Sequence, residues 1–160
     1  MDFYHVLLLF HIGLGELAGL CFLWVTVDTI NRTDNGLKRA KIVSGVGAIS
    51  ALSAWIVGGL YYLRHYGPKV KPVLIAETSN LKWAHNLLIE SKEHIFLFIP
   101  ILALAAFILY YRTPGWTSMG ESTSKKAVML SALIFVLCFI MAGFGAMISG
   151  AVRSLTGGGI

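Results

Sequence analysis

The sequence predicts an all-α protein, a bundle of four transmembrane helices with both termini on the same side of the membrane. Its 160 residues are 56% hydrophobic and only 13% charged, and the mean hydropathy is +0.73. A soluble domain of this size carries about 25% charged residues. Four apolar stretches, each near the roughly 20 residues that cross a bilayer, fill most of the chain. We therefore expect residues 1–160 to form a single integral membrane domain.

The first two spans are expected at about 3–27 and 42–63. The first lacks a basic opening region and an early cleavage site, so we expect a retained helix rather than a removable signal peptide. Residues 31–36, which read Asn-Arg-Thr-Asp-Asn-Gly, form a turn cluster between the two spans. The second span ends in tyrosines, whose amphipathic rings favour the headgroup level.

The third and fourth spans are expected at about 82–111 and 127–152, after a loop over about 64–82. Only the later part of the third span is continuously apolar. Residues 81–94 can therefore be read in two ways, as the start of the transmembrane helix or as an amphipathic helix that lies at the interface. Pro100 predicts a kink, and Thr113-Pro114-Gly115 ends the helix.

Small residues at helical spacing predict where the helices approach one another. They let helices pack closely in lipid, where van der Waals contact replaces the hydrophobic effect. They form a GxxxG pair on the first span and ridges on the second and fourth spans: Gly15 and Gly19; Gly47, Ala51, Ala54 and Gly58; Gly143, Ala146 and Gly150.

The basic balance of the chain indicates orientation rather than a nucleic-acid partner. The net charge is +5, but the Lys and Arg residues are scattered among the loops with no stripe of interleaved aromatics. The loops at 28–41 and 112–126 carry Arg32, Lys38, Arg39, Lys41, Arg112, Lys125 and Lys126, whereas the side of the termini carries Arg64, Lys69, Lys71, Lys82 and Arg153. Because cytoplasmic loops are richer in Lys and Arg, this bias predicts termini outside, in a bacterial-type inner or plasma membrane.

Ionisable residues inside the apolar spans are the main functional feature of the sequence. A charge in lipid costs at least about 2.5–3.5 kcal/mol, so such residues usually mark a function or a bound cofactor. Simple topology places all of them at the end of the bundle that holds the termini: His5, His11 and Glu16 in the first span, and His85, Glu90, Glu93 and His94 where the third begins.

Helical geometry sorts these residues into faces. His5 and Glu16 are eleven residues apart and share a face, whereas His85 and His94 are nine apart and point to opposite sides. Glu90 and His94, at i and i+4, share a face. We expect a bundle-facing set that joins His11 or His5 to His94 and a glutamate.

Several chemistries could use this set. A b-type haem needs one or two imidazoles from facing helices inside an apolar sleeve. A transition-metal site would use His with Glu at i and i+4, as Glu90 and His94 provide, with His11 as the other candidate ligand. A proton path would relay through Glu16, Glu93 and the histidines. The paired Glu-x-x-His motifs of di-iron carboxylate bundles are absent. If residues 81–94 lie at the interface, then His85, Glu90 and Glu93 are ordinary surface groups.

The segment YHVLLLFHIGLGELAGL resembles the opening helix of small four-helix b-type haem membrane proteins. This resemblance implies a haem b with His11 and His94 as axial ligands. The chain has neither the CxxCH motif of c-type cytochromes nor the four-histidine pattern of the large quinol-oxidising cytochromes b.

The function expected first is a membrane-embedded b-type haem electron-transfer protein, a subunit of a larger membrane complex and not an enzyme by itself. Two alternatives stay open: a cofactor-free accessory subunit whose polar cluster binds a neighbouring chain or lipid, and a metal- or proton-handling membrane protein. In the haem reading His94 matters more than His85, and His5 is a further cofactor-binding candidate. Glu90 and Glu93 orient an imidazole or meet a propionate, and Glu16 is protonated or hydrogen-bonded to another helix.

Overall fold

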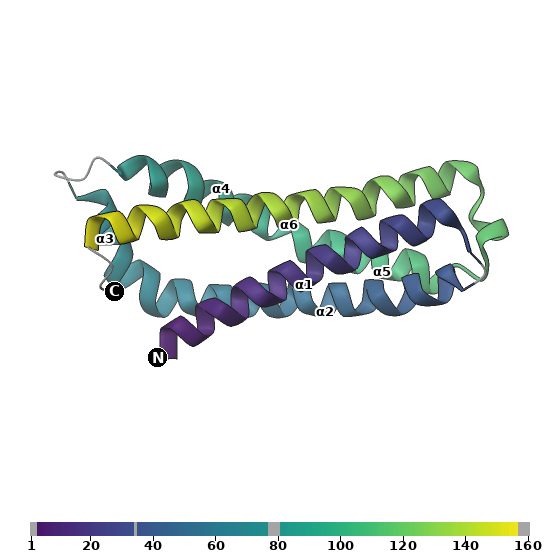
Figure 1. Cartoon of the computed structure of the whole chain (residues 1–160), viewed down its shortest axis with the longest axis horizontal. Coiled ribbons are helices and arrows are strands. Elements are labelled where there is room, and N and C mark those ends of the chain that lie inside the picture. Colours follow the sequence, from purple (N-terminus) through teal and green to yellow (C-terminus); the bar gives the residue numbers. More distant parts are fainter. Residues whose placement is uncertain (1–2, 34, 77–80, 157–160) are drawn as a thin grey trace.

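A computed structural model of the chain describes residues 3–33, 35–76 and 81–156, and shows long helices that run side by side (Figure 1). The described residues contain no strand. Four helical stretches are long and apolar enough to cross a membrane: Phe3–Asn31, Gly36–Ile75, Ala84–Arg112 and Glu121–Ser154. The predicted all-α four-helix bundle is confirmed. The first helix begins, and the last helix finishes, at the same end of the bundle (Figure 1). These helices support a multi-pass integral membrane protein.

The first two helices are joined at the end of the bundle opposite the termini, which we call the loop end. Helix α1 spans Phe3–Asn31 and α2 spans Gly36–Tyr61. The buried carboxylate of Asp28 pairs with the guanidinium of Arg39 at 2.6 Å. The indole of Trp116 donates a hydrogen bond to the Thr33 carbonyl at 3.0 Å. These contacts tie the α1–α2 turn to the later loop at the same end.

The second stretch is longer than predicted. After α2 the chain continues through a π-helix, η1 (Tyr62–Val70), into α3 (Lys71–Ile75). The predicted loop at 64–82 is therefore wrong for residues 64–75. Pro68 lies inside η1. Proline lacks the N–H that a regular α-helix requires, and the helix continues past it with the wider turns of a π-helix, which is rare in proteins.

The third stretch is broken near its proline, as predicted. It consists of a π-helix η2 (Ala84–Ile89), α4 (Glu90–Phe96) and α5 (Phe98–Arg112). A proline ring collides with the carbonyl four residues earlier. For Pro100 that residue is Phe96, and this is where α4 ends.

The last helix follows a short connection. A 3-10 turn, η3 (Trp116–Met119), leads through Gly120 into α6 (Glu121–Thr156). Gly120 has φ +60°, a conformation that side chains disfavour. At about 1.5 Å per residue, α6 is much longer than the roughly 30 Å hydrocarbon core of a bilayer.

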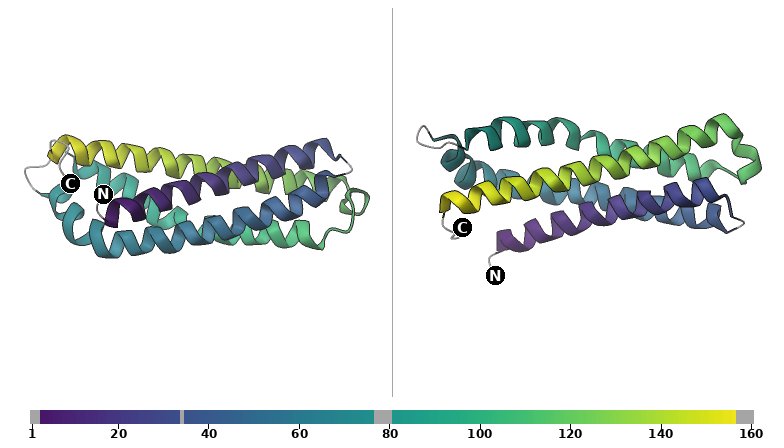
Figure 2. Two further views of the ribbon diagram at one scale, coloured as in Figure 1. Left: turned by 60° about the horizontal axis from the view of Figure 1, so that its bottom comes forward. Right: turned by 45° about the horizontal axis from the view of Figure 1, so that its top comes forward.

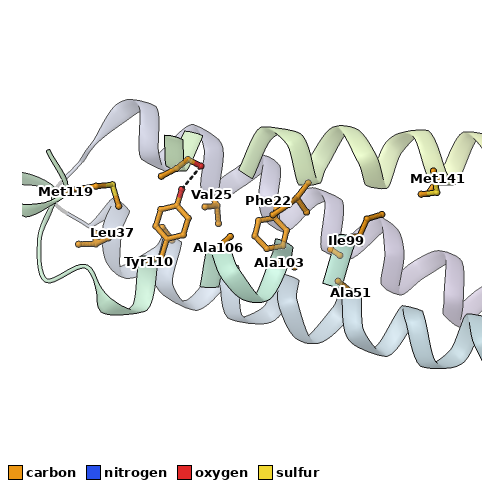
Figure 3. Close-up of a cluster of buried hydrophobic side chains, with 14 residues drawn as sticks. Phe22, Val25, Leu37, Ala51, Ile99, Ala103, Ala106, Tyr110, Met119 and Met141 are labelled. Carbon is orange, nitrogen blue, oxygen red and sulfur yellow. Dashed lines mark hydrogen bonds between the residues drawn. The ribbon is translucent and has the colours of Figure 1, made fainter. Parts of the chain in front are cut away.

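The main hydrophobic core lies toward the loop end, between α1, α2, α5 and α6 (Figure 3). Phe22, Val25 and Ile134 are fully buried there together with Tyr110. The Tyr110 hydroxyl lies 2.8 Å from the Thr29 hydroxyl and 3.1 Å from that of Ser131. An unpaired polar group would be costly at this depth, so the network lets a tyrosine link three helices inside an apolar core.

Two glycines set the close approaches of α1. A Cβ at Gly47 of α2 would lie 2.9 Å from the Phe22 ring, and one at Gly19 would lie 3.1 Å from Cβ of Cys138 on α6. The predicted ridge on α2 therefore packs against α1. The predicted ridge on α6 does not pack in the same way, since Gly143 and Gly150 have open space around their Cβ positions.

We predict that Gly47→Ala lowers the stability of the bundle, whereas Gly143→Ala does not. The new methyl group at position 47 meets the Phe22 ring, and overpacking of this kind costs about 1–3 kcal/mol. At position 143 the methyl group meets nothing within 4 Å. The midpoint of thermal unfolding in detergent measures both effects, and equal midpoints for the two variants would contradict the α1–α2 packing described here.

Candidate functional site

Toward the termini α1 and α6 diverge, as Figure 1 and the left view of Figure 2 show. Between them lies a cavity of about 600 Å³, which we call the terminal cavity. Its walls come from α1, the α2–η1 junction, η2 with α4, and the end of α6. The polar and aromatic lining residues are Tyr4, His5, His11, Tyr61, Tyr62, His65, Tyr66, Lys92, Glu93, Phe96, Ser149 and Arg153.

A smaller cavity of about 220 Å³ adjoins the terminal cavity on the side of the main core. The two share His11, Lys92, Phe96 and Ser149 among their lining residues. The smaller cavity is otherwise mostly apolar and reaches Glu16. The two cavities therefore adjoin at these shared residues, with the smaller one on the side of the main core.

The imidazole of His11 is held at the junction of the two cavities. Its Nδ1 lies 2.9 Å from the carbonyl oxygen of Ala54 on α2. A carbonyl can only accept, so Nδ1 carries the hydrogen and Nε2 carries the lone pair. A Cβ at Gly58 would lie 2.6 Å from two atoms of this ring. The glycine thus provides the space in which the histidine sits.

Lys92 of α4 occupies the opposite wall. Its side chain is partly buried, and its Nζ would lie 3.4 Å from a Cβ at Gly145 of α6. The ion pairs between described residues are Asp28 with Arg39 and Glu121 with Lys125, so Lys92 has none there. The terminal cavity is therefore bordered by an imidazole and an ammonium group, each beside a glycine.

Aromatic rings form the outer wall of the terminal cavity. The ring of His65 lies 4.7 Å from that of Tyr4 and 5.3 Å from that of Tyr61. Tyr62 stacks on Tyr66 at 5.3 Å. The Tyr66 hydroxyl lies 3.0 Å from Nδ1 of His85, a buried histidine behind this wall.

Four of the residues predicted from the sequence lie on the cavities. His5 and Glu93 line the terminal cavity, Glu16 lines the smaller one, and His11 lines both. Glu16 is exposed, and it makes no hydrogen bond or ion pair with another described residue. The bond to a neighbouring helix that the sequence suggested is therefore absent from the described part of the chain.

The other three predicted residues lie elsewhere, and the expected inward face of the third stretch was wrong. His94 is exposed, and its Nδ1 donates to the Glu90 carbonyl one turn earlier at 2.6 Å. Glu90 is exposed as well, whereas His85 is buried. The apolar stripe that includes Ala84 and Leu88 faces the bundle and takes His85 inward with it. His94, nine residues further on, then points outward.

Sequence reasoning missed His65, Lys92 and the tyrosine wall as site residues. His65 and Tyr66 fall in the stretch expected to be a loop, where no facing could be assigned. Lys92 stands among polar residues, between Ser91 and Glu93, so its sequence neighbours gave no indication that it faces inward.

No group of three or more His, Cys, Asp or Glu side chains that could hold a metal ion occurs among the described residues. In comparisons with known proteins, no family model, curated protein or solved structure matches this chain.

We predict that Gly58→Ala displaces the His11 imidazole, whereas Gly59→Ala leaves it in place. The first methyl group would collide with the ring and break its hydrogen bond to Ala54, whereas the second meets nothing within 4 Å. The lost bond and the strain together should cost about 1–3 kcal/mol in free energy of unfolding. Nitrogen NMR of the His11 ring reports the bond directly, and an unchanged Nδ1 signal in Gly58→Ala would contradict this geometry.

Proposed function

We propose that the chain is a membrane-embedded b-type haem protein that transfers electrons, with His11 as an axial ligand. The observation that carries the proposal is the hydrogen bond from His11 Nδ1 to the Ala54 carbonyl at the wall of the terminal cavity. Histidines that ligate metals usually donate their second ring nitrogen to a carbonyl or carboxylate in this way, which fixes the tautomer and the ring orientation.

The rest of the terminal cavity suits a flat amphiphile with acidic groups. Its volume falls in the range of about 300–1,000 Å³ typical of sites for small molecules and cofactors. Phe96 and the tyrosines supply flat apolar walls, and its cations, Lys92 and Arg153, could meet carboxylates. A haem bound there would supply one-electron transfer at low reorganisation cost, whereas the chain contributes position and charge compensation.

A second imidazole ligand, if one is used, would come from His5 or His65. Both line the terminal cavity with His11, whereas the originally favoured His94 lies on the outside of α4. Of the two, His65 is buried and is held between Tyr4 and Tyr61.

Glu16 supports a place in a larger membrane complex. It is an exposed carboxyl group about thirteen residues into α1, where about 20 Å of apolar helix separates it from the N-terminal end. An unpaired acid on a lipid-facing surface is costly, and a neighbouring chain could remove that cost. This observation also favours the cofactor-free accessory subunit as a second candidate function.

We predict that His11→Ala abolishes haem retention, whereas His94→Ala leaves it unchanged. Replacing a group that merely orients a ligand weakens metal binding about 10–100-fold, so removing the ligand itself should cost at least as much. The Soret band per protein after purification with added haem measures retention, with reduced α and β bands to identify a b-type centre.

His65→Ala and His5→Ala, measured together, identify the second ligand. A wild-type chain that stays folded and colourless in the presence of haem would contradict the proposal and favour the accessory-subunit function. Loss of haem in His94→Ala but not in His11→Ala would show that the haem binds at the outer face of α4 and not in the terminal cavity.

For the orientation we propose termini outside, in a bacterial-type inner membrane, because the loop end carries more Lys and Arg. A reporter that is active only outside the cytoplasm should be active when fused to either terminus. The same reporter inserted at the exposed Thr117 should be inactive. The opposite pattern would reverse the orientation, and a different result at each terminus would contradict an even number of spans.

A further inference from the structure

We propose that Lys92 is the anion anchor of the terminal cavity and binds the acidic group of an amphiphilic ligand, whose apolar part extends toward the smaller cavity. The proposal rests on the proposed function in that both place a ligand in the same cavity. It names the recognition chemistry, a carboxylate or phosphate oxygen paired with the Lys92 ammonium, which a haem propionate or an acidic lipid headgroup can supply.

The first support is that Lys92 lacks a partner within the described chain. A lysine inside a membrane helix usually pairs with an acid or extends to the interface. Neither ion pair found between described residues includes it. The nearest acid in sequence, Glu93, lies against the hydroxyl of Tyr62 instead. The ammonium therefore lines both cavities without a direct ion pair to a described residue.

The second support is the direction in which the side chain runs. The Lys92 stem does not turn outward to water. Its Nζ lies against α6, 3.4 Å from where a Cβ at Gly145 would be. Arg153, which lies near the end of α6 and also lines the terminal cavity, adds a second cation at its exposed rim. The cations thus lie along one path from the rim inward.

The third support is the depth of the site in a bilayer. The charged residues Asp28, Lys41, Arg112 and Lys126 bound the apolar helices at the loop end. An apolar crossing of about 20 residues from that limit ends at roughly residues 8, 61, 92 and 146 of the four stretches. Lys92 therefore lies at the boundary between hydrocarbon and headgroups on the side of the termini.

The two cavities fit this boundary. The smaller cavity lies on the hydrocarbon side of Lys92 and is lined mainly by apolar residues such as Ile12, Ile99 and Met141. The terminal cavity lies on the headgroup side and holds the cations and tyrosines. An amphiphile with an acidic end matches both environments at once, whereas a neutral apolar molecule would leave Lys92 unpaired.

The test compares acidic ligands with their neutral counterparts on the detergent-purified full chain. In one arm, haem is compared with haem dimethyl ester by titration of the Soret band. In the other, phosphatidylglycerol is compared with phosphatidylcholine by the shift of the unfolding midpoint. Wild type should prefer the acidic member of at least one pair by roughly tenfold in Kd, equivalent to about 1.4 kcal/mol.

Lys92→Gln should lose this preference, and Lys92→Arg should keep most of it. Lys126→Gln is the matched control, because it removes the same charge from an exposed site at the loop end. The wild-type comparison of acid with ester needs no variant, so the test survives if Lys92→Gln fails to fold.

A preference in the haem arm that Lys92→Gln removes identifies the partner as a propionate. A preference for the acidic lipid alone supports Lys92 as the anion anchor. If the wild type then shows no haem spectrum, the proposed haem function is contradicted while the anchor proposal stands. No preference in either arm, or a preference that Lys92→Gln and Lys126→Gln reduce equally, overturns it.

Discussion

The seating of Phe22 against Gly47 is the contact on which the rest of this bundle depends. It lets α1 and α2 approach closely, and the ion pair of Asp28 with Arg39 adds a polar link between the same two helices at the loop end. The Tyr110 network then links α1 to α5 and α6. Gly19 brings α1 equally close to α6. Helices fixed at one end and crossing at an angle must separate at the other. Figure 1 shows this separation of α1 from α6 toward the termini, and the terminal cavity lies between the separated ends.

The proposed depth of the cavity, at the boundary between hydrocarbon and headgroups, accounts for its mixture of residues. In hydrocarbon every polar group needs a partner within the protein, as the Tyr110 hydroxyl has. At headgroup level, imidazoles, phenols and ammonium groups can coexist with an apolar wall. His11 has a backbone partner and Lys92 has none in the described chain. In the proposed function this asymmetry gives the two residues complementary roles: His11 coordinates the ligand, and Lys92 pairs with its acidic group.

Glycines shape the site as well as the packing. Gly58 and Gly145 stand on opposite walls, and each leaves the space that a longer side chain from a neighbouring helix occupies. In lipid-embedded bundles small residues are usually explained by helix–helix contact alone. Here the same residue type serves both purposes: Gly47 admits a ring that stabilises the core, whereas Gly58 admits a ring that faces a cavity. A glycine motif in the sequence cannot by itself distinguish the two.

The sequence by itself determined the all-α class, the four spans, the turn clusters, the break near Pro100 and the gathering of ionisable residues at one end. These follow from hydropathy, proline chemistry and helix length, which are local properties. Only the tertiary structure decided which face of each helix turns inward. The third stretch buries His85 and exposes His94 because its apolar stripe packs on α6 and η1. This facing depends on contacts with segments that are distant in the sequence. For the same reason Lys92 and His65 became visible as site residues only when the helices around them were in place.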